Sequence, residues 1–350
     1  MTEGPLVAAL QSNVPQSVKE SGQASDEIFR DLLKNSEAAA QAGAELIIWP
    51  ETMVQATLDP RVLEQLSGLY HCKIVDKILR QHAKDTAFVL VGAYGGVLKE
   101  LNPVPKFAER YNSVFLYTPD GTQSNKQYSK IHLVPFGEYV PFRKSFPFLY
   151  NILMKFTPYD FDYSLDAGKQ YTVFEMTRGP RAREDEKQIY KFSVMICYEG
   201  TVPAIARRFA VNQQGQKQVD WLANISNDGW FVKFVNGQAY PSTELAQHAA
   251  IYVFRAVENR LSIIRSVNTG ISCLIDSLGR IRDGFVAASP NFPYKAMERQ
   301  GMAGWFADKM PIDKRVTFFS RYGQWLDLSC AVGFVGLVIV IVLEKLKIKI

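Results

Sequence analysis

Short apolar runs recur along most of this chain, each followed by a segment with helical periodicity, and this alternation limits the possible folds most strongly. The runs that have the character of buried strands include Leu46–Trp49, Phe88–Val91, Phe192–Ile196 and Trp221–Ile225. A helix is expected from Ser25 to about Ala42, because Ser25 can cap its first turn and Gly43 can end it. Strands that alternate with helices predict a layered α/β domain with a mixed sheet.

The other expected elements belong to the same layered domain, and a chain of 350 residues is long enough to bury one large core. Further strands are expected at Leu6–Leu10, Ser262–Val267, Ile271–Ile275 and Arg280–Val286, and a hairpin at Val114–Tyr117 and Gln123–Tyr128. Further helices are expected at about Arg61–Lys84, Val202–Val211 and Thr243–Asn259. The first of these should bury one face formed by Leu63, Leu66, Ile74 and Ile78.

The C-terminal region contains an uncharged apolar run, Leu328–Leu343. At about 1.5 Å per residue it would extend roughly 24 Å, slightly less than the hydrocarbon core of a bilayer, which is about 30 Å thick. Tyr322 and Trp325 before the run, and lysines after it, could complete a membrane span; a buried core element is the alternative. We therefore divide the chain into a globular domain (1–290), a connector (291–326), a transmembrane helix (327–344) and a basic tail (345–350).

The charges at the two ends give an expected orientation. Lysines follow the apolar run, so the extreme C-terminus is expected in the cytoplasm and the globular domain on the other side of the membrane. The first residues, Met1–Pro5, have no basic and apolar pattern of a signal peptide. Either another segment delivers the domain across the membrane, or the chain is a piece of a longer assembly.

Composition excludes several classes of protein. The formal charge of +5 is small for this length. Without a clustered basic face, such a charge does not indicate a nucleic-acid binder, so no nucleic-acid partner is expected. Neither a disulfide framework nor a metal site is expected, and no cofactor, because the histidines are dispersed and the cysteines have no C-x-x-C pair. The four cysteines are Cys72, Cys197, Cys273 and Cys330.

Three residues with reactive side chains follow apolar or β-rich strand candidates. Glu51 comes directly after Ile47–Pro50, where α/β sheets commonly build sites, although such a glutamate can also cap the next helix. Lys130 ends a strand and opens a loop rich in proline and glycine; a lone lysine there is commonly solvated. Cys197 stands at a strand end, where a turn can present its thiol, or it is a buried inert thiol.

Together these residues indicate covalent catalysis by a thiol. A thiol needs a base that accepts its proton, and the attacked carbonyl needs a donor that stabilises the developing oxyanion. Glu51 can act as the base and Lys130 as the oxyanion-stabilising cation for Cys197. A cation beside a thiolate also lowers the thiol pKa.

The sequence motifs around these residues resemble those of the nitrilase (carbon–nitrogen hydrolase) superfamily, and more closely those of its apolipoprotein N-acyltransferase family. The resemblance covers about Pro5 to Val286, and the C-terminal apolar run is similar to a closing helix of that family. The matching motifs are Asn13–Ser17, Trp49–Glu51, Lys130–Pro141, Ile196–Glu199, Ile225–Phe231 and Asn268–Ser272.

This resemblance implies a nitrilase-like αββα sandwich on the periplasmic side of a bacterial inner membrane. It implies transfer of an acyl chain from a phospholipid, through a thioester on Cys197, to the N-terminal amine of a diacylglyceryl-cysteine lipoprotein. It also implies supporting roles for Glu138, Tyr198 and Glu199. Family members carry membrane helices before this domain, so a separate multi-helix membrane subunit is a possible partner.

Residues 142–161 are rich in aromatic and aliphatic side chains and are either a buried helix or an arm that lies on the bilayer and admits acyl chains. Two other functions stay open. One is a membrane-tethered carbon–nitrogen hydrolase (an amidase), in which water replaces the lipoprotein amine. The other is a non-catalytic partner subunit that uses the fold as a binding surface.

Overall fold

Two β-sheets form the centre of the computed structural model, which describes residues 1–19, 24–68, 70–101, 105–143, 145–157, 163–178, 188–236 and 238–345. The larger sheet has the order β13-β14-β1-β2-β3-β4-β5 and the smaller one β12-β11-β8-β7-β6. Strands of the larger sheet are β1 (Thr2–Gln11), β2 (Leu46–Ile48), β3 (Phe88–Glu100), β4 (Lys106–Tyr117), β5 (Gln123–Ser129), β13 (Ala287–Ala288) and β14 (Gly304–Ile312). Those of the smaller sheet are β6 (Phe174–Arg178), β7 (Gln188–Ile196), β8 (Trp221–Ser226), β11 (Ser262–Val267) and β12 (Leu274–Ile275).

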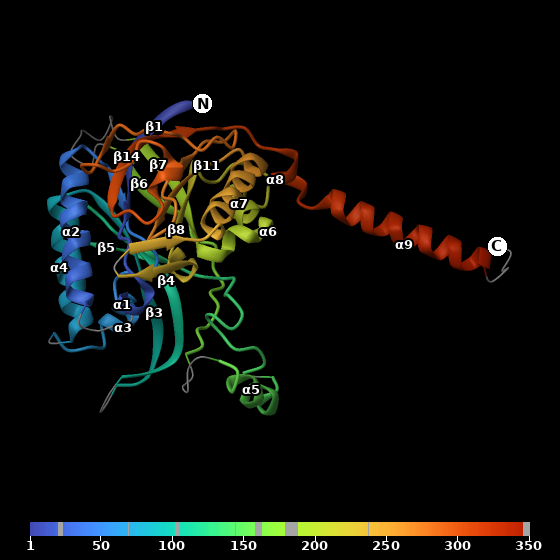
Figure 1. The fold of residues 1–350 in the computed structure, drawn as a ribbon, viewed down its shortest axis with the longest axis horizontal. Helices are drawn as coiled ribbons and strands as arrows, with labels where there is room; N and C mark the ends of the chain where they lie inside the picture. Colours follow the sequence, from blue (N-terminus) through green and yellow to red (C-terminus); the bar gives the residue numbers. More distant parts are fainter. Residues whose placement is uncertain are drawn as a thin grey trace.

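Helices cover the outer face of each sheet, which gives the expected αββα sandwich (Figure 1). On the larger sheet lie α2 (Ser25–Gln41) and α4 (His71–Asp85), and on the smaller one α6 (Pro203–Ala210) and α7 (Glu244–Asn259). Side chains alternate along the strands: Ile48 packs in the core between the sheets, whereas its neighbour Ile47 packs under α2 and α4. The layered α/β fold predicted from the sequence is confirmed.

One expected helix is in fact two, with a different buried face. Residues 61–84 divide into α3 (Pro60–Leu63) and α4, so the helical register starts again at His71. Leu63 and Leu66 are buried as expected. Ile74 and Ile78 are exposed instead, because α4 presents Val75, Leu79, His82 and Ala83 to the core.

The predicted connector 291–326 contains part of the sheet, so this boundary needs correction. β14 pairs antiparallel with β1 along most of its length, from Thr2↔Ile312 to Gln11↔Gly304. Asp308, Lys309 and Pro311 interrupt its apolar pattern, which hid the strand in the sequence. Conversely, the expected strand Arg280–Val286 has only an isolated bridge from Ile281 to Ile275. The globular domain therefore extends beyond 290 to at least Ile312.

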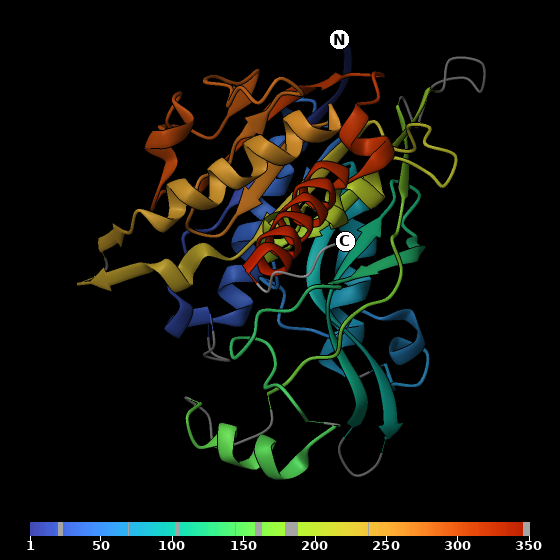
Figure 2. The same cartoon turned by 90° about the vertical axis from the view of Figure 1, so that its right-hand side faces the viewer.

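Two helices stand apart from the sandwich. α5 (Pro147–Met154) has no buried residue, so the buried-helix interpretation of this region is wrong, although Lys144 and residues 158–162 lie outside the described part. α9 (Trp325–Lys345) likewise has no buried residue and is the one helix in the described residues that is long and apolar enough to cross a membrane. Figure 2 shows α5 at the lower end of the molecule and α9 pointing toward the viewer.

Deletion of residues 324–350 should separate membrane attachment from folding. Because α9 has no buried residue, its loss should change the melting temperature of the domain by less than about 2 °C. Membrane fractionation and a thermal melt check both expectations. A truncated protein whose membrane retention is unchanged, or that no longer melts cooperatively, would contradict this account.

Candidate active site

Glu51 lies in the turn after β2, next to the carboxyl end of the buried strand. Its carboxylate accepts a hydrogen bond from the Asn112 side-chain amide at 2.7 Å and one from the backbone N–H of Asn227 at 2.8 Å. The turn packs tightly against β3, where a Cβ on Gly92 would lie 2.6 Å from the carbonyl oxygen of Pro50. Only glycine fits there, so the backbone turn that carries Glu51 lies directly against the strand.

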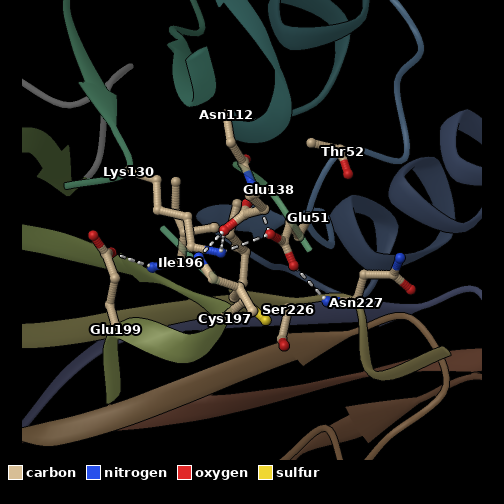
Figure 3. Close-up of polar contacts among 12 residues, drawn as sticks. Glu51, Thr52, Asn112, Lys130, Glu138, Ile196, Cys197, Glu199, Ser226 and Asn227 are labelled. Atoms are coloured by element: carbon tan, nitrogen blue, oxygen red, sulfur yellow. Dashed lines mark hydrogen bonds and ion pairs between the residues drawn. The ribbon is translucent and has the colours of Figure 1, made fainter. Parts of the chain in front are cut away.

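Lys130 follows β5 and is buried, with 1% of its surface exposed. Its Nζ lies 2.7 Å from a carboxylate oxygen of Glu138 and 3.5 Å from one of Glu51. Burial disfavours the ammonium, but the negative charges of Glu51 and Glu138 outweigh it and raise the pKa of Lys130. The ammonium therefore stays charged between two carboxylates (Figure 3).

Cys197 begins the short helix η2 (Cys197–Thr201) at the end of β7, with a left-handed φ of 50°. Few residues other than glycine adopt this conformation, and it marks a strained turn that presents the side chain. Burial, followed by the charge of Glu51, raises the pKa of the Cys197 thiol, and Lys130 opposes this shift. The resting thiol is therefore protonated and needs a base before it can attack a carbonyl.

The predicted supporting residues fall into two groups. Glu138 touches the site directly: it binds Lys130 and accepts hydrogen bonds from Asn112 and from the backbone N–H of Val134. Tyr198 does not; it is 40% exposed and its ring stacks on His132 with 5.7 Å between centroids. It lies at the surface of the turn, not among the carboxylates.

Glu199 ties the lysine loop to the cysteine turn. One carboxylate oxygen accepts hydrogen bonds from the Tyr128 hydroxyl and the backbone N–H groups of Ile131 and His132, and the other from that of Ile196. Burial raises the pKa of Glu199, whereas these donors act in the opposite direction. Through this side chain, the loop after Lys130 and the strand end before Cys197 share one anchor.

Sequence reasoning missed residues that position the three reactive groups. Asn112 bridges Glu51 and Glu138 from β4, but a single asparagine before an apolar run gave no signal. Asn227 lies within the motif Ile225–Phe231, but the sequence did not indicate that its backbone N–H binds Glu51. The structure thus brings Glu51, Lys130, Glu138 and Cys197 together, and it adds two asparagines that hold them (Figure 3).

The structure places a thiol, a buried ammonium and carboxylates together on an αββα sandwich. The sequence was also compared with models of known protein families. Residues 6–287 match the family model described as "Carbon-nitrogen hydrolase". The chain belongs to the carbon–nitrogen hydrolase family.

Curated relatives point to one branch of that family. An apolipoprotein N-acyltransferase of Geobacter metallireducens is 29% identical over 93% of this chain and 52% of its own length. "Apolipoprotein N-acyltransferase 1" of Treponema pallidum is 33% identical over 70% of this chain and 40% of its own length. The chain thus spans about half the length of the curated relatives it matches.

Solved structures support the fold. An amidase from Nesterenkonia sp. superposes with a TM-score of 0.53 at 14% identity, over 90% of this chain and 93% of the amidase. A mutant of that amidase with the acetamide moiety of fluoroacetamide covalently added at its active-site cysteine gives 0.52 at 15% identity, over 92% and 93%. At such low identity these neighbours establish the fold and nothing finer.

Two substitutions should shift the pKa of the Cys197 thiol in opposite directions. Glu51 raises this pKa and Lys130 lowers it, so Glu51→Gln should lower it and Lys130→Met should raise it further. Thiolate absorbance followed against pH, with the Cys197→Ser protein subtracted, measures each value. Shifts of the same sign in both variants would mean that these charges do not act on this sulfur.

Proposed function

We propose that this chain performs the acyl-transfer chemistry of an apolipoprotein N-acyltransferase. The reaction would move a fatty acyl chain from a phospholipid to the N-terminal amine of a diacylglyceryl-cysteine lipoprotein. The observation that carries the proposal is the convergence of Glu51, Lys130 and Cys197 in a chain similar to curated N-acyltransferases over 93% of its length. The phospholipid donor, the thioester and the three roles belong to the proposal.

In the first half-reaction Cys197 would attack the ester carbonyl of the phospholipid. The thiol proton moves to Glu51 as the carbon–sulfur bond forms, and Lys130 stabilises the negative charge that appears on the carbonyl oxygen. The intermediate collapses when the ester carbon–oxygen bond breaks. The departing oxygen takes the proton from Glu51, which leaves a lysophospholipid and a thioester on Cys197.

In the second half-reaction the lipoprotein amine would attack the thioester carbonyl. Glu51 accepts a proton from the amine, and Lys130 again faces the oxyanion. The carbon–sulfur bond then breaks, an amide forms, and the proton returns from Glu51 to the sulfur of Cys197. The raised pKa of this thiol favours its return to the protonated resting state.

The proposed substrates require a membrane, and two exposed elements suit one. α9 can span the bilayer, with the catalytic domain on the periplasmic side of the inner membrane because lysines follow the helix. The exposed phenylalanines of the α5 region, Phe146, Phe148 and Phe156, could lie at the acyl-chain level of the bilayer. A separate multi-helix membrane subunit would be a further partner, and co-purification from native membranes tests it.

A hydrolase is the second candidate, because residues 6–287 match the carbon–nitrogen hydrolase family model. The same three residues could cleave a small amide, with water as the acceptor in the second half-reaction. A non-catalytic binding subunit would need neither reaction.

Mass spectrometry after incubation with phospholipid vesicles tests the proposed function. An acyl adduct on Cys197 that hydroxylamine removes is expected, and so is its disappearance in Cys197→Ala. Cys72→Ala is the matched control, since Cys72 is also partly buried and lies on α4, outside the site. Turnover of a small amide without a lipid adduct would favour the hydrolase; absence of both would favour a binding role, and acyl transfer by Cys197→Ala would refute the mechanism.

A further inference from the structure

A second group of buried polar residues holds the main chain of Cys197. The carbonyl oxygen of Cys197 accepts a hydrogen bond from the Tyr252 hydroxyl at 2.6 Å and one from His248 Nε2 at 3.3 Å. Both donors come from α7, and both are buried. Gly200 permits this approach, because a Cβ there would lie 2.4 Å from the Tyr252 ring.

The hydrogen-bond partners of His248 define its protons. Nδ1 lies 2.9 Å from a carboxylate oxygen of Asp228, and Nε2 faces the Cys197 carbonyl. Carboxylate and carbonyl oxygens only accept hydrogen bonds, so a ring nitrogen is suited to face one of them when it carries a proton. The arrangement therefore suits an imidazolium cation, which donates from both nitrogens. A neutral ring would direct a lone pair at one of the two oxygens.

Asp228 provides the charge that such a cation needs. It is fully buried, and its carboxylate also contacts Arg265 at 3.4 Å and the Ser226 hydroxyl at 2.6 Å. Burial opposes its ionisation, but His248 and Arg265 outweigh burial and lower the pKa of Asp228. Arg265 in turn donates to the His248 carbonyl and lies over the Tyr252 ring, 4.7 Å from its centroid. These residues form one packed unit beneath the cysteine turn.

The anchored carbonyl fixes the peptide that follows the reactive sulfur. Cys197 has a left-handed φ, a strained conformation that persists only when the surrounding structure holds it. In a planar trans peptide the C=O and N–H groups point in opposite directions. Because Tyr252 and His248 hold the Cys197 carbonyl, they also direct the N–H of Tyr198 to the opposite side of the turn.

We propose that His248, as an imidazolium paired with Asp228, and Tyr252 are positioning residues that hold the Cys197–Tyr198 peptide in the orientation required for attack by the thiol. The inference rests on Cys197 being the nucleophile of the proposed function. Neither residue touches the reacting sulfur; both act through the carbonyl. The cation beneath the turn also favours the negative charge that attack transfers into the site.

Nitrogen NMR of the full chain, labelled selectively with 15N-histidine, tests the charge. The chain has four histidines, and the spectrum of His248→Gln assigns the one in question. At about pH 7 both ring nitrogens of His248 should carry protons. His82 is an internal reference: burial lowers its pKa to about 4, so its ring should be neutral in the same sample. A single protonated nitrogen on His248 would overturn the assignment of charge.

Alkylation of Cys197 by iodoacetamide tests positioning without lipid or lipoprotein. Peptide mass spectrometry separates Cys197 from the other cysteines. His248→Gln and Tyr252→Phe should each slow its alkylation about tenfold, the effect of losing one hydrogen bond to the anchored carbonyl. His82→Gln is the matched control, because His82 and His248 are both 6% exposed and His82 binds Ser36, away from the site. This control should react at the rate of the unaltered protein.

The possible failures have different meanings. Unchanged alkylation in both His248→Gln and Tyr252→Phe would overturn the positioning role, whatever reaction the chain catalyses. Alkylation of Cys197 slowed by these variants, in a chain that never forms a lipid adduct, would overturn the proposed function and leave the positioning role intact. If thioester formation is measurable, the variants should lower the acylation rate and leave KM nearly unchanged. A defect in KM alone would also count against positioning.

Discussion

The ion pairs of Lys130 are the interaction on which the site depends. A buried ammonium is costly unless carboxylates compensate it, and Glu51 and Glu138 do so at 3.5 and 2.7 Å. Two carboxylates and one ammonium leave one excess negative charge, and burial together with this charge keeps the nearby thiol protonated. During attack that charge would pass from Glu51 to the substrate oxygen as the proton moves the other way. The net charge of the site with its substrate would then stay the same during attack. Lys130 would lie beside the negative charge both before attack, on Glu51, and after attack, on the substrate oxygen.

The sequence was sufficient to predict the layers and to select candidate residues that the structure brings together, because both depend on local patterns. Glu51 and Cys197 each follow a buried strand that the sequence shows as an apolar run. Lys130 follows β5, a polar strand that was predicted as half of a hairpin. β14 was missed because its pairing with β1 lets Asp308 occupy a buried position, and such compensation is invisible in a local pattern. Asn112 was missed for a related reason: its partners come from distant segments.

The residues packed beneath the cysteine turn, His248, Tyr252, Asp228 and Arg265, extend the proposed site beyond its reactive atoms. Groups from α7 bind the carbonyl of Cys197, a residue with a left-handed φ, and these groups in turn contact Asp228 and Arg265. His248 gave no sequence signal, since an isolated histidine in a helical pattern is commonly a core residue. The role proposed for His248 is inferred from the two oxygen acceptors that face its two ring nitrogens. Proton donors and acceptors therefore carry information that residue spacing does not.

The chemistry of the reactive groups does not by itself choose between water and an amine as the final acceptor. In the proposed mechanism Glu51 would deprotonate either acceptor, and Lys130 would stabilise the same oxyanion in both reactions. The choice must therefore lie in what reaches the thioester. The exposed phenylalanines of the α5 region are apolar groups that take no part in the proposed proton transfers. A lipid that occupies such surfaces would exclude water from the carbonyl, which a small amide cannot do. On this argument, selectivity for the amine would come from the first substrate's own acyl chain.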